Sequence, residues 1–592
     1  MHAPLEVSPT RTVSDWLDGL NAAIRAGDPD RIGALFEADS HWRDALALTW
    51  TIATVSGRPE IQRRLAVSGV QCGIGNVAVD PDRCPPRIVE RAGVATVEAI
   101  LQFETDVGRG AGLVRIRSDR PAGATPQAWT LFTALEDLKG HEETAIQARR
   151  DEPAFAREFH GLNWLDRRQQ SRAYEDRDPA VLIVGGGHAG LTAAARLGQL
   201  GVDTLVVDQE ERIGDNWRLR YHGLKLHNQR HSNHLPYMPF PGTWPTYIPK
   251  DKIANWLETY AESMEINFWT RTSFEGAAFD RTSGHWAARL RLADGAIREI
   301  RPRHIIMATS VSGTPNIPAI PTLDRFGGAI VHSSGFRDGA EWQNRDVMVL
   351  GTGTSAHDIA QDLHGNGARV TMVQRSPTLV VNIEPSAQLY DGVYLGDGPS
   401  LEDRDLISAS MPLPLVKAAH KRITDAVKEH DKPLLDGLEK VGFSLDFGEG
   451  GTGWPLKYRQ RGGGYYFNVG CSELIAAGEI GLIQYSAITE FTEGGARLKD
   501  GGLRRAELIV LATGYKGQEH LVETLFGAEV AQRVGPIWGF DPATQELRNM
   551  WMRTRQPGLW FTASAFSQCR IYSKLLALQI KAAEIGLPMP PG

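Results

Sequence analysis

The sequence predicts an α/β protein with two doubly wound units, one inserted into the other, behind a smaller α+β unit. Strand–glycine–helix patterns begin at Val181 and again at Val347, and a later strand ends in Ala-Thr-Gly. The first 150 residues carry helical periodicity first and β-branched or aromatic segments afterwards. At 592 residues the chain is longer than one typical domain of about 100–200 residues, so several domains are expected.

Composition favours small-molecule chemistry. The formal net charge of −7 gives no electrostatic reason to expect nucleic acid or anionic lipid as a partner. Neither a signal peptide nor a membrane span is predicted, and we expect a cytoplasmic protein whose oligomeric state is left open. The four cysteines are scattered singly, which predicts neither disulfides nor a metal site.

Residues 1–150 are predicted to form the α+β unit. Val13–Ala26 has apolar residues at helical spacing, Asp28-Pro29 opens a second short helix that reaches Phe36, and a third helix lies near Pro59–Leu65. The expected antiparallel strands are Thr96–Phe103, Ala111–Ile116 and Ala128–Leu138. This order resembles the SnoaL-like cone, or nuclear-transport-factor-like fold. Trp42 and Asp44 are interpreted as an aromatic anchor beside a solvated charge, with pocket-lining residues of such a cone as the alternative, and no catalytic role is assigned to them.

A polar segment separates this unit from the rest. Residues 151–178 are predicted to be a linker, and its charged part, Asp166–Asp178, reads as an extended connection or a surface helix.

The first strand–glycine–helix unit predicts a dinucleotide site. The buried strand Val181–Val184 leads into Gly185, Gly187 and Gly190, the G-x-G-x-x-G pattern at the start of a helix. These glycines allow a tight turn, a close approach of backbone to a diphosphate and close helix packing. The next strand ends in Asp208, an acid that can accept hydrogen bonds from a ribose hydroxyl.

The second unit repeats the pattern with a different strand end. Asp346–Leu350 leads into Gly351 and Gly353, and Ser355 opens the following helix. Strand Arg369–Gln374 then ends beside Arg375, a cation that can pair with a 2′-phosphate. Different charges at the two strand ends indicate two different dinucleotides. We expect FAD at the first site and NADPH, not NADH, at the second.

These sites predict a Rossmann-like, discontinuous FAD-binding domain, with an NADPH-binding domain inserted into it. The FAD-binding domain is expected over residues 179–340 and 500–592, and the NADPH-binding domain over residues 341–499. The Ala-Thr-Gly strand that contains Thr513 and Gly514 is expected to return to the FAD-binding domain.

The stretch Phe326–Phe336 matches the F-x-G-x-x-x-H-x-x-x-(Y/F) signature, so residues from about Val181 onward resemble flavin-containing monooxygenases, a class B flavoprotein family. Gly214-Asp215-Asn216-Trp217, Leu224-Lys225-Leu226-His227 and Leu235–Pro241 resemble the YUCCA-type enzymes in particular. The chain departs from them at Ala308-Thr309-Ser310, over Glu384–Tyr466 and in the extra N-terminal unit. The segment Glu384–Tyr466 is expected to shape the substrate side.

The resemblance implies a monooxygenase that consumes NADPH and inserts one oxygen atom of O2 into a small organic substrate through a C4a-(hydro)peroxyflavin. It implies Asn228 as the oxygen-site residue, although YUCCA-type sequences lack this Asn and an Asx turn is its structural alternative. Further residues expected near the cofactors are Trp217, His227, Thr513, Gly514 and Gln568.

Other functions stay open on the sequence, among them a redox-sensing or binding protein whose N-terminal unit recruits a ligand. A Baeyer–Villiger monooxygenase is disfavoured by Phe336, where that group carries Trp, and a disulfide reductase by the lack of Cys-x-x-Cys. An NADPH-dependent flavin reductase or oxidase would share both dinucleotide sites. The substrate itself is not identified: amines, sulfides, keto acids and small aromatics all fit.

Overall fold

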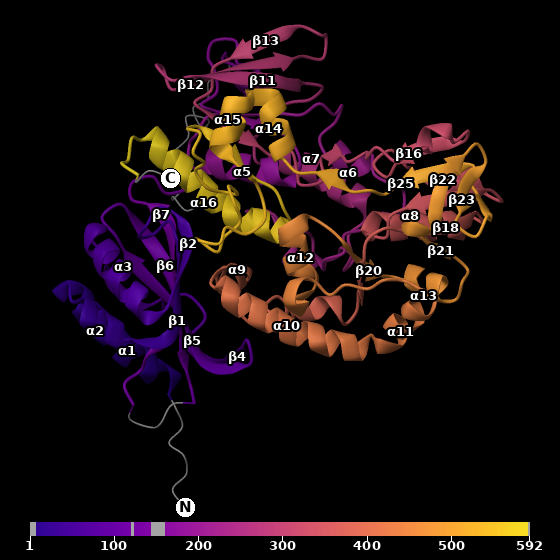
Figure 1. Cartoon of the computed structure of the whole chain (residues 1–592). Helices are drawn as coiled ribbons and strands as arrows, with labels where there is room; N and C mark the ends of the chain where they lie inside the picture. The colour runs from indigo at the N-terminus through magenta and orange to yellow at the C-terminus, as the bar shows by residue number, and fades with distance from the viewer. Residues whose placement is uncertain (1–7, 120–123, 144–159, 590–592) are drawn as a thin grey trace, which may run out of the picture.

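The computed structural model describes residues 8–119, 124–143 and 160–589. Its N-terminal unit packs helices α1 (Pro9–Ala26), α2 (Pro29–Ala34) and α3 (Arg58–Gln71) on a sheet of order β2-β1-β7-β6-β5-β3, with β4 paired to β5 (Figure 1). The strands are β1 (Phe36–Ala45), β2 (Ile52–Ser56), β3 (Gly75–Val79), β4 (Arg87–Arg91), β5 (Val94–Glu104), β6 (Gly108–Arg117) and β7 (Ala128–Leu138). The three expected helices and three expected strands are present, and β5, β6 and β7 pair antiparallel, but the second helix ends at Ala34 and Phe36 opens β1 instead.

The segment around Trp42 is a strand whose two faces differ. Trp42 and Asp44 point to the helix-covered side, where Thr133 receives a hydrogen bond from Trp42 Nε1 and donates one to Asp44. Asp44 is only 2% exposed, so its interpretation as a solvated charge is wrong. Burial raises the pKa of its carboxyl to about 6, although the hydroxyls of Thr133 and Thr49 and two backbone N–H groups hydrogen-bond to it.

The expected linker contains one helix. Helix α4 (Trp164–Ala173) is capped by Asn163 and attaches to the next unit through Trp164, whose indole donates to Glu265. Residues 144–159, which include the start of this linker, lie outside the described residues.

The first doubly wound sheet is wholly parallel, in the order β10-β9-β8-β14-β27. Its strands are β8 (Val181–Val184), β9 (Thr204–Val207), β10 (Asn267–Trp269), β14 (His304–Met307) and β27 (Leu559–Phe561). Helix α5 (His188–Gln199) packs on β8 and β9, and α7 (Lys250–Ser263) and α16 (Phe566–Glu584) pack against α5. At the top of Figure 1 lie β11 (Ser273–Asp280), β12 (His285–Arg291) and β13 (Ile297–Ile300), above α14 (Glu519–Phe526) and α15 (Ala528–Val534).

The second parallel sheet has the order β16-β25-β17-β18-β21. Its strands are β16 (Ala329–His332), β17 (Asp346–Leu350), β18 (Arg369–Gln374), β21 (Gly481–Gln484) and β25 (Leu508–Leu511), and α8 (Thr354–Gly365) follows β17. Strand β25 pairs with β16 and β17, so the expected return of the Ala-Thr-Gly strand to the first sheet is wrong. Strand β27 provides that return instead, because it pairs with β14.

Short sheets flank these two. Strands β22 (Ile488–Thr492), β23 (Gly495–Leu498) and β24 (Leu503–Arg505) form an antiparallel sheet, and β15 (Thr314–Pro315) pairs with β26 (Tyr515–Lys516).

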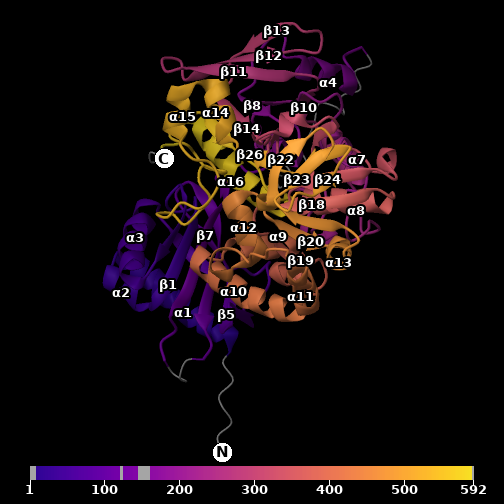
Figure 2. The same cartoon turned by 45° about the vertical axis from the view of Figure 1, so that its right-hand side comes forward.

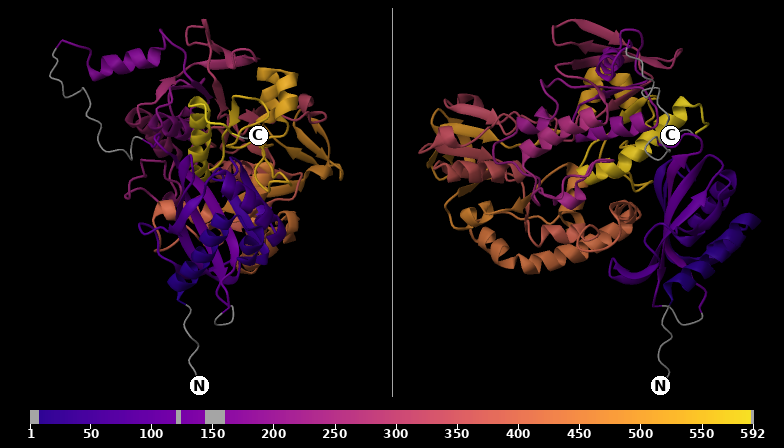
Figure 3. Two further views of the ribbon diagram at one scale, coloured as in Figure 1. Left: turned by 90° about the vertical axis from the view of Figure 1, so that its left-hand side faces the viewer. Right: turned by 180° about the vertical axis from the view of Figure 1, so that it is seen from behind.

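A helical segment joins the second sheet to the N-terminal unit. It contains α9 (Leu401–Ala409), α10 (Leu413–His430), α11 (Lys432–Lys440) and α12 (Gly453–Arg461), between strands β19 (Leu379–Asn382) and β20 (Tyr465–Asn468), and α13 (Cys471–Ala476) follows β20. Figure 2 labels α9 and α10 beside the N-terminal unit, and in the right panel of Figure 3, seen from behind, the same orange segment lies next to the indigo N-terminal unit. In the part of the chain that the structure describes, no helix is long and apolar enough to cross a bilayer.

Candidate functional site

In the first glycine turn, neighbouring backbone atoms leave no room for a side chain. Gly185 has φ +108°, and a Cβ on Gly190 would lie 2.0 Å from the carbonyl oxygen of Gly185. Gly187 is the N-cap of α5 and has no side-chain cap, so the first N–H groups of the helix stay open to a ligand. This geometry fits a diphosphate, because the free N–H groups and the helix dipole both favour an anion.

The second turn has the same arrangement of glycines before a helix, with more space at its second glycine. Gly351 has φ +127°, and a Cβ there would lie 2.3 Å from the carbonyl oxygen of Ala512. Gly353 caps α8 without a side-chain hydrogen bond, and no described atom lies within 4 Å of the place its Cβ would take. Ser355 lies half-buried in the first helical turn. The geometry fits a second diphosphate.

The two strand ends differ in charge, as the sequence predicts. Asp208 follows β9 and accepts hydrogen bonds from the backbone N–H of Gly186 at 2.6 Å and of Glu210 at 2.9 Å. Its carboxylate therefore lies directly against the first turn. Arg375 follows β18 and is exposed, and its one hydrogen bond among the described residues is a long one of 3.5 Å from Nε to Ser376.

Four other expected cofactor residues surround the turns. Trp217, in α6 (Asp215–Arg218), lies 6.2 Å from the ring of His188 in the first turn. His227 faces α8 instead, with Nε2 3.8 Å from Asp358. Thr513 donates to the carbonyl oxygen of Asn316, and the carbonyl oxygen of Gly514 lies 3.1 Å from Nε2 of His332. The contact between His227 and Asp358 links the first unit to α8, whereas the contact between His332 and Gly514 lies within the second sheet.

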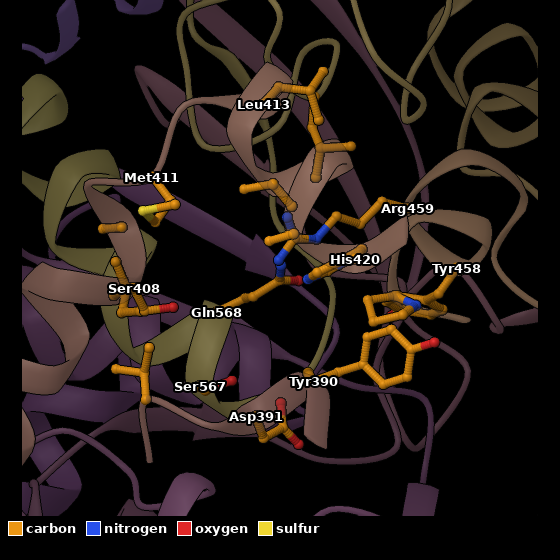
Figure 4. A pocket seen from close by; sticks show the side chains of 18 of the residues that line it. Tyr390, Asp391, Ser408, Met411, Leu413, His420, Tyr458, Arg459, Ser567 and Gln568 are labelled. Atoms are coloured by element: carbon orange, nitrogen blue, oxygen red, sulfur yellow. The ribbon is translucent and has the colours of Figure 1, made fainter. Parts of the chain in front are cut away.

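A cavity of about 470 Å³ lies between segments far apart in the sequence. Its walls come from the N-terminal unit, from residues 389–423, from α12 with Tyr465, and from residues 540–572. Asn228 also lines it, and so does Gln568, in the first turn of α16 (Figure 4). Two predicted site residues are therefore brought together here.

Asn228 pairs with a carboxyl in this cavity. Its Nδ2 donates to Asp391 Oδ2 at 3.2 Å, across 163 residues of sequence, which is not the local contact of an Asx turn. Burial raises the pKa of Asp391 to about 6, while the hydrogen bond from Asn228 and the positive charge of Arg459 act in the opposite direction. Asp391 therefore gains or loses its proton close to neutral pH.

The cation Arg459 also lines the cavity. Arg459 meets Gln568 near the centre of Figure 4, and its Nε and Nη2 both lie 3.1 Å from the Gln568 amide oxygen in the orientation that satisfies both groups. It forms no ion pair with a carboxylate of the described residues, and burial lowers the pKa of its guanidinium. His420 stays neutral, because burial and the charge of Arg459 lower its pKa to about 3.

The cavity adjoins both glycine turns. His188, which follows Gly187, stacks on Phe566 at 4.1 Å, and its Nε2 lies 2.7 Å from the carbonyl oxygen of Ser564. Ser564 in turn contacts Gln568. On the other side, Thr354 of the second turn donates to the carbonyl oxygen of the cavity residue Tyr465 at 2.8 Å. A molecule in the cavity is thus one layer of residues from each dinucleotide turn.

Sequence reasoning missed most of the cavity wall. Asp391 and Arg459 belong to the segment that departs from YUCCA-type sequences, where no motif marks either one. The only signal was the expectation that Glu384–Tyr466 shapes the substrate side, and this segment does line the cavity.

Comparisons with known proteins place the chain in a family. A protein-family model described as pyridine nucleotide-disulphide oxidoreductase matches residues 182–390. The indole-3-pyruvate monooxygenase YUCCA1 of Oryza sativa is 29% identical over 357 residues, 60% of this chain and 80% of that protein. YUCCA4 of Arabidopsis thaliana is 30% identical over 340 residues, 57% of this chain and 76% of that protein. The chain belongs to the class B flavin monooxygenases.

Solved structures agree on the fold. A cyclohexanone monooxygenase mutant from Rhodococcus, bound to NADP⁺, matches with a TM-score of 0.52 at 16% identity, covering 69% of this chain and 87% of that one. A steroid monooxygenase bound to NADP matches with a TM-score of 0.51 at 19% identity, covering 69% and 86%. The two-dinucleotide-domain architecture of this monooxygenase is therefore confirmed.

Family membership fixes the reaction class. The monooxygenase is an oxidoreductase that uses FAD and NADPH, as the two turns predicted, and it acts on a small organic substrate with O2. The match of the oxidoreductase model reflects the shared fold, because the sequence has no Cys-x-x-Cys for a dithiol reaction.

Proposed function

We propose that the turn Gly185–Gly190 binds the FAD diphosphate and that Gly351 and Gly353 bind the NADPH diphosphate. Asp208 then accepts hydrogen bonds from the FAD ribose, and Arg375 pairs with the 2′-phosphate of NADPH. Two observations support this assignment: the open helix N-termini at both turns, and the opposite charges at the two strand ends. Ser355 adds a hydroxyl to the second cradle.

We propose that the cavity of about 470 Å³ receives the substrate. The observation that carries this proposal is its contact with both turns, through Ser564 and Gln568 on one side and Thr354 on the other. When bound, FAD and NADPH supply the electrons and the activation of O2. The protein's task is then to hold the substrate beside them and to keep water out.

We propose that Asn228 hydrogen-bonds to polar groups in this cavity and that Asp391 takes up and releases a proton there. The Asn228 amide can donate one N–H to Asp391 and offer its other N–H to an oxygen atom of the reaction. Asp391 can hold a proton at Oδ1 or Oδ2 below about pH 6 and release it above.

The substrate class is proposed to be a small carboxylic acid, such as a 2-keto acid. Arg459 supports this proposal, because it is a buried cation without a carboxylate partner among the described residues. The relatives also support a keto acid, because YUCCA1 of Oryza sativa is described as an indole-3-pyruvate monooxygenase.

For the rest of the chain we propose the division expected from the sequence, with two changes. The N-terminal domain, residues 1–150, is proposed to be a SnoaL-like cone, supported by three helices on one face of a seven-stranded sheet. Strands β16 and β25 are assigned to the NADPH-binding domain because they lie in its sheet.

Product analysis tests the function. Purified enzyme with NADPH, O2 and a panel of keto acids, sulfides and cyclic ketones is scored by mass spectrometry, with hydrogen peroxide measured in parallel. Decarboxylated acids support the proposal, whereas esters from ketones would indicate Baeyer–Villiger chemistry. NADPH consumption that yields only hydrogen peroxide across the panel contradicts the substrate class.

Two variants test the proton role. Asn228→Ala should raise the share of NADPH that ends as hydrogen peroxide, and Asp391→Asn should flatten the pH profile of product formation around pH 6, because the titrating carboxyl is gone. Glu384→Gln, at an exposed carboxyl outside the cavity wall, is the matched control and should leave the profile unchanged. An unchanged profile in Asp391→Asn removes Asp391 from the mechanism.

A further inference from the structure

The N-terminal sheet has two faces with different partners. Alternate residues of a strand point to opposite faces, so Arg43 of β1 points away from Trp42 and Asp44. Arg43 lies opposite Phe132 of β7, which lies opposite Leu113 of β6, and Arg115 is two residues further along β6. Arg43 and Arg115 therefore share the face that is not covered by α1 and α3.

Arg43 is bound almost entirely by the catalytic part of the chain. Its Nε and Nη2 each lie 2.7 Å from one carboxylate oxygen of Glu546, and Nη2 also donates to the Tyr572 hydroxyl at 3.2 Å. Its Nη1 donates to the carbonyl oxygen of Ala409. The side chain is 4% exposed, and a two-pronged contact of this kind fixes orientation as well as distance.

A second buried arginine holds the neighbouring strands. Arg115 is 0% exposed and donates to Glu98 at 2.9 Å and to the Ser410 hydroxyl at 2.8 Å. The turn after β4 also lies tightly against α10, because a Cβ on Gly93 would overlap Arg422. This face is therefore fixed to α9 and α10 at several points across the sheet.

The helix-covered face holds a much smaller space. Between its helices and the sheet, the described residues leave a void of about 10 Å³, lined by apolar side chains such as Leu20, Leu65 and Phe103. That volume is about one water molecule, far below the roughly 300 Å³ of a small ligand site. Trp42, Asp44 and Thr133 satisfy one another there.

The face that carries Arg43 borders the substrate cavity instead. Ile52 of β2 lies on this face, because its neighbour Thr54 pairs with Arg43 and donates to Glu546. Arg43 and Ile52 line the cavity, as does the β4 edge, residues 90–92. They meet Tyr572 and Met550 from the catalytic part on the same cavity wall.

We infer that the N-terminal domain forms a permanent wall of the substrate cavity, with Ile52 limiting substrate size and Arg43 as the positioning residue that holds the wall against Glu546. This inference rests on the proposed function, which assigns the substrate to that cavity. It gives the extra domain a role in substrate selection and water exclusion rather than in binding a separate ligand.

The test makes the cavity smaller with one variant and larger with another. Ile52→Trp fills the cavity, and Ile52→Ala enlarges it; Val70→Trp, 61% exposed on α3 away from the cavity, is the matched control for a new tryptophan. Dissociation constants of phenylacetate and the larger indole-3-acetate for the oxidised holoenzyme are measured by calorimetry, which needs no turnover. The ratio of phenylpyruvate to indole-3-pyruvate oxygenation is measured alongside.

Ile52→Trp should weaken indole-3-acetate binding by about tenfold or more and phenylacetate binding by less, whereas Ile52→Ala should favour the larger acid. The two opposite shifts keep the test decisive if the tryptophan variant does not fold. Equal effects on both acids, no effect, or no binding of either acid to the wild type overturns the inference. If binding of the two acids changes as expected but neither keto acid is oxygenated, the proposed substrate class is wrong and the role of the N-terminal domain in the cavity wall still holds.

Arg43 has its own test. Arg43→Lys keeps one charged contact to Glu546, whereas Arg43→Met leaves that carboxylate without a positive charge and with only the Thr54 hydroxyl. Arg43→Met should raise the KM for the substrate and the hydrogen peroxide share with little change in FAD content, and Arg43→Lys should restore part of both. Arg25→Met, an exposed cation at the end of α1, is the control. A uniform loss of kcat with unchanged KM and peroxide share would count against a positioning role.

Discussion

The two glycine turns share one design and differ in how tightly they are built. In the first turn the last small residue must be glycine, because a Cβ on Gly190 would meet the Gly185 carbonyl oxygen at 2.0 Å. At the same place in the second turn stands Ala356, so a Cβ is accommodated there. The difference shows that two turns with similar glycine patterns can differ in backbone crowding, which the pattern alone does not reveal.

The largest expected effect comes from filling the tight turn. Gly190→Ala should leave most purified enzyme without FAD, because an overpacking cost of about 3 kcal/mol corresponds to roughly a hundredfold weaker binding. Gly353→Ala is the control, since no described atom lies within 4 Å of its Cβ position. The ratio of flavin to protein absorbance measures the result. Equal flavin content in both variants would break the comparison between the turns.

The next effect concerns the cation at the second strand end. Arg375→Ala should erase most of a preference for NADPH over NADH that we expect to be at least about tenfold, or about 1.4 kcal/mol. Arg369→Ala, at the other end of β18 and paired with Asp346, is a matched exposed-arginine control. The ratio of kcat/KM for the two nucleotides is the measurement. A wild-type ratio in Arg375→Ala excludes this residue as the phosphate partner.

The smallest effect separates charge from hydrogen bonding at the first strand end. Asp208→Asn keeps an oxygen for the N–H of Gly186 but loses the negative charge, and should weaken FAD binding by about threefold. Asp208→Ala removes both and should cost about tenfold or more. Reconstitution of the apoenzyme, followed by flavin fluorescence, gives both constants. Equal losses in the two variants would show that the charge, not the hydrogen bond to the turn, is what matters.

The sequence predicted the regular parts of this molecule well. Asp346–Leu350, Arg369–Gln374 and Ala128–Leu138 have the expected bounds, because buried parallel strands and hydrophobic antiparallel strands leave clear patterns. Strand β1 was missed, since its charged residues Arg43 and Asp44 are buried on opposite faces and no polar alternation remains. Strand β25 was placed in the wrong sheet because a short buried strand does not reveal its neighbours.

The cavity could not be predicted for a different reason. Its polar residues come from segments that carry no motif, and they meet only through tertiary packing. Arg43 and Glu546 are 503 residues apart in the sequence, and neither one suggests the other. The expectation that the N-terminal domain folds as a separate unit stays a prediction, although this buried ion pair shows how closely its sheet is joined to the rest.

Helix α16 has a consequence for how the protein is assembled. It touches the first turn through Phe566, the cavity through Gln568, and the N-terminal sheet through Tyr572 and through Lys574, which pairs with Glu136. During synthesis the N-terminal sheet leaves the ribosome long before α16 does, so its docking face meets water first. Arg43 meets the Tyr572 hydroxyl of α16, whereas Arg115 is covered by Ile407 and Ser410, so this face is completed only when both later segments have been made.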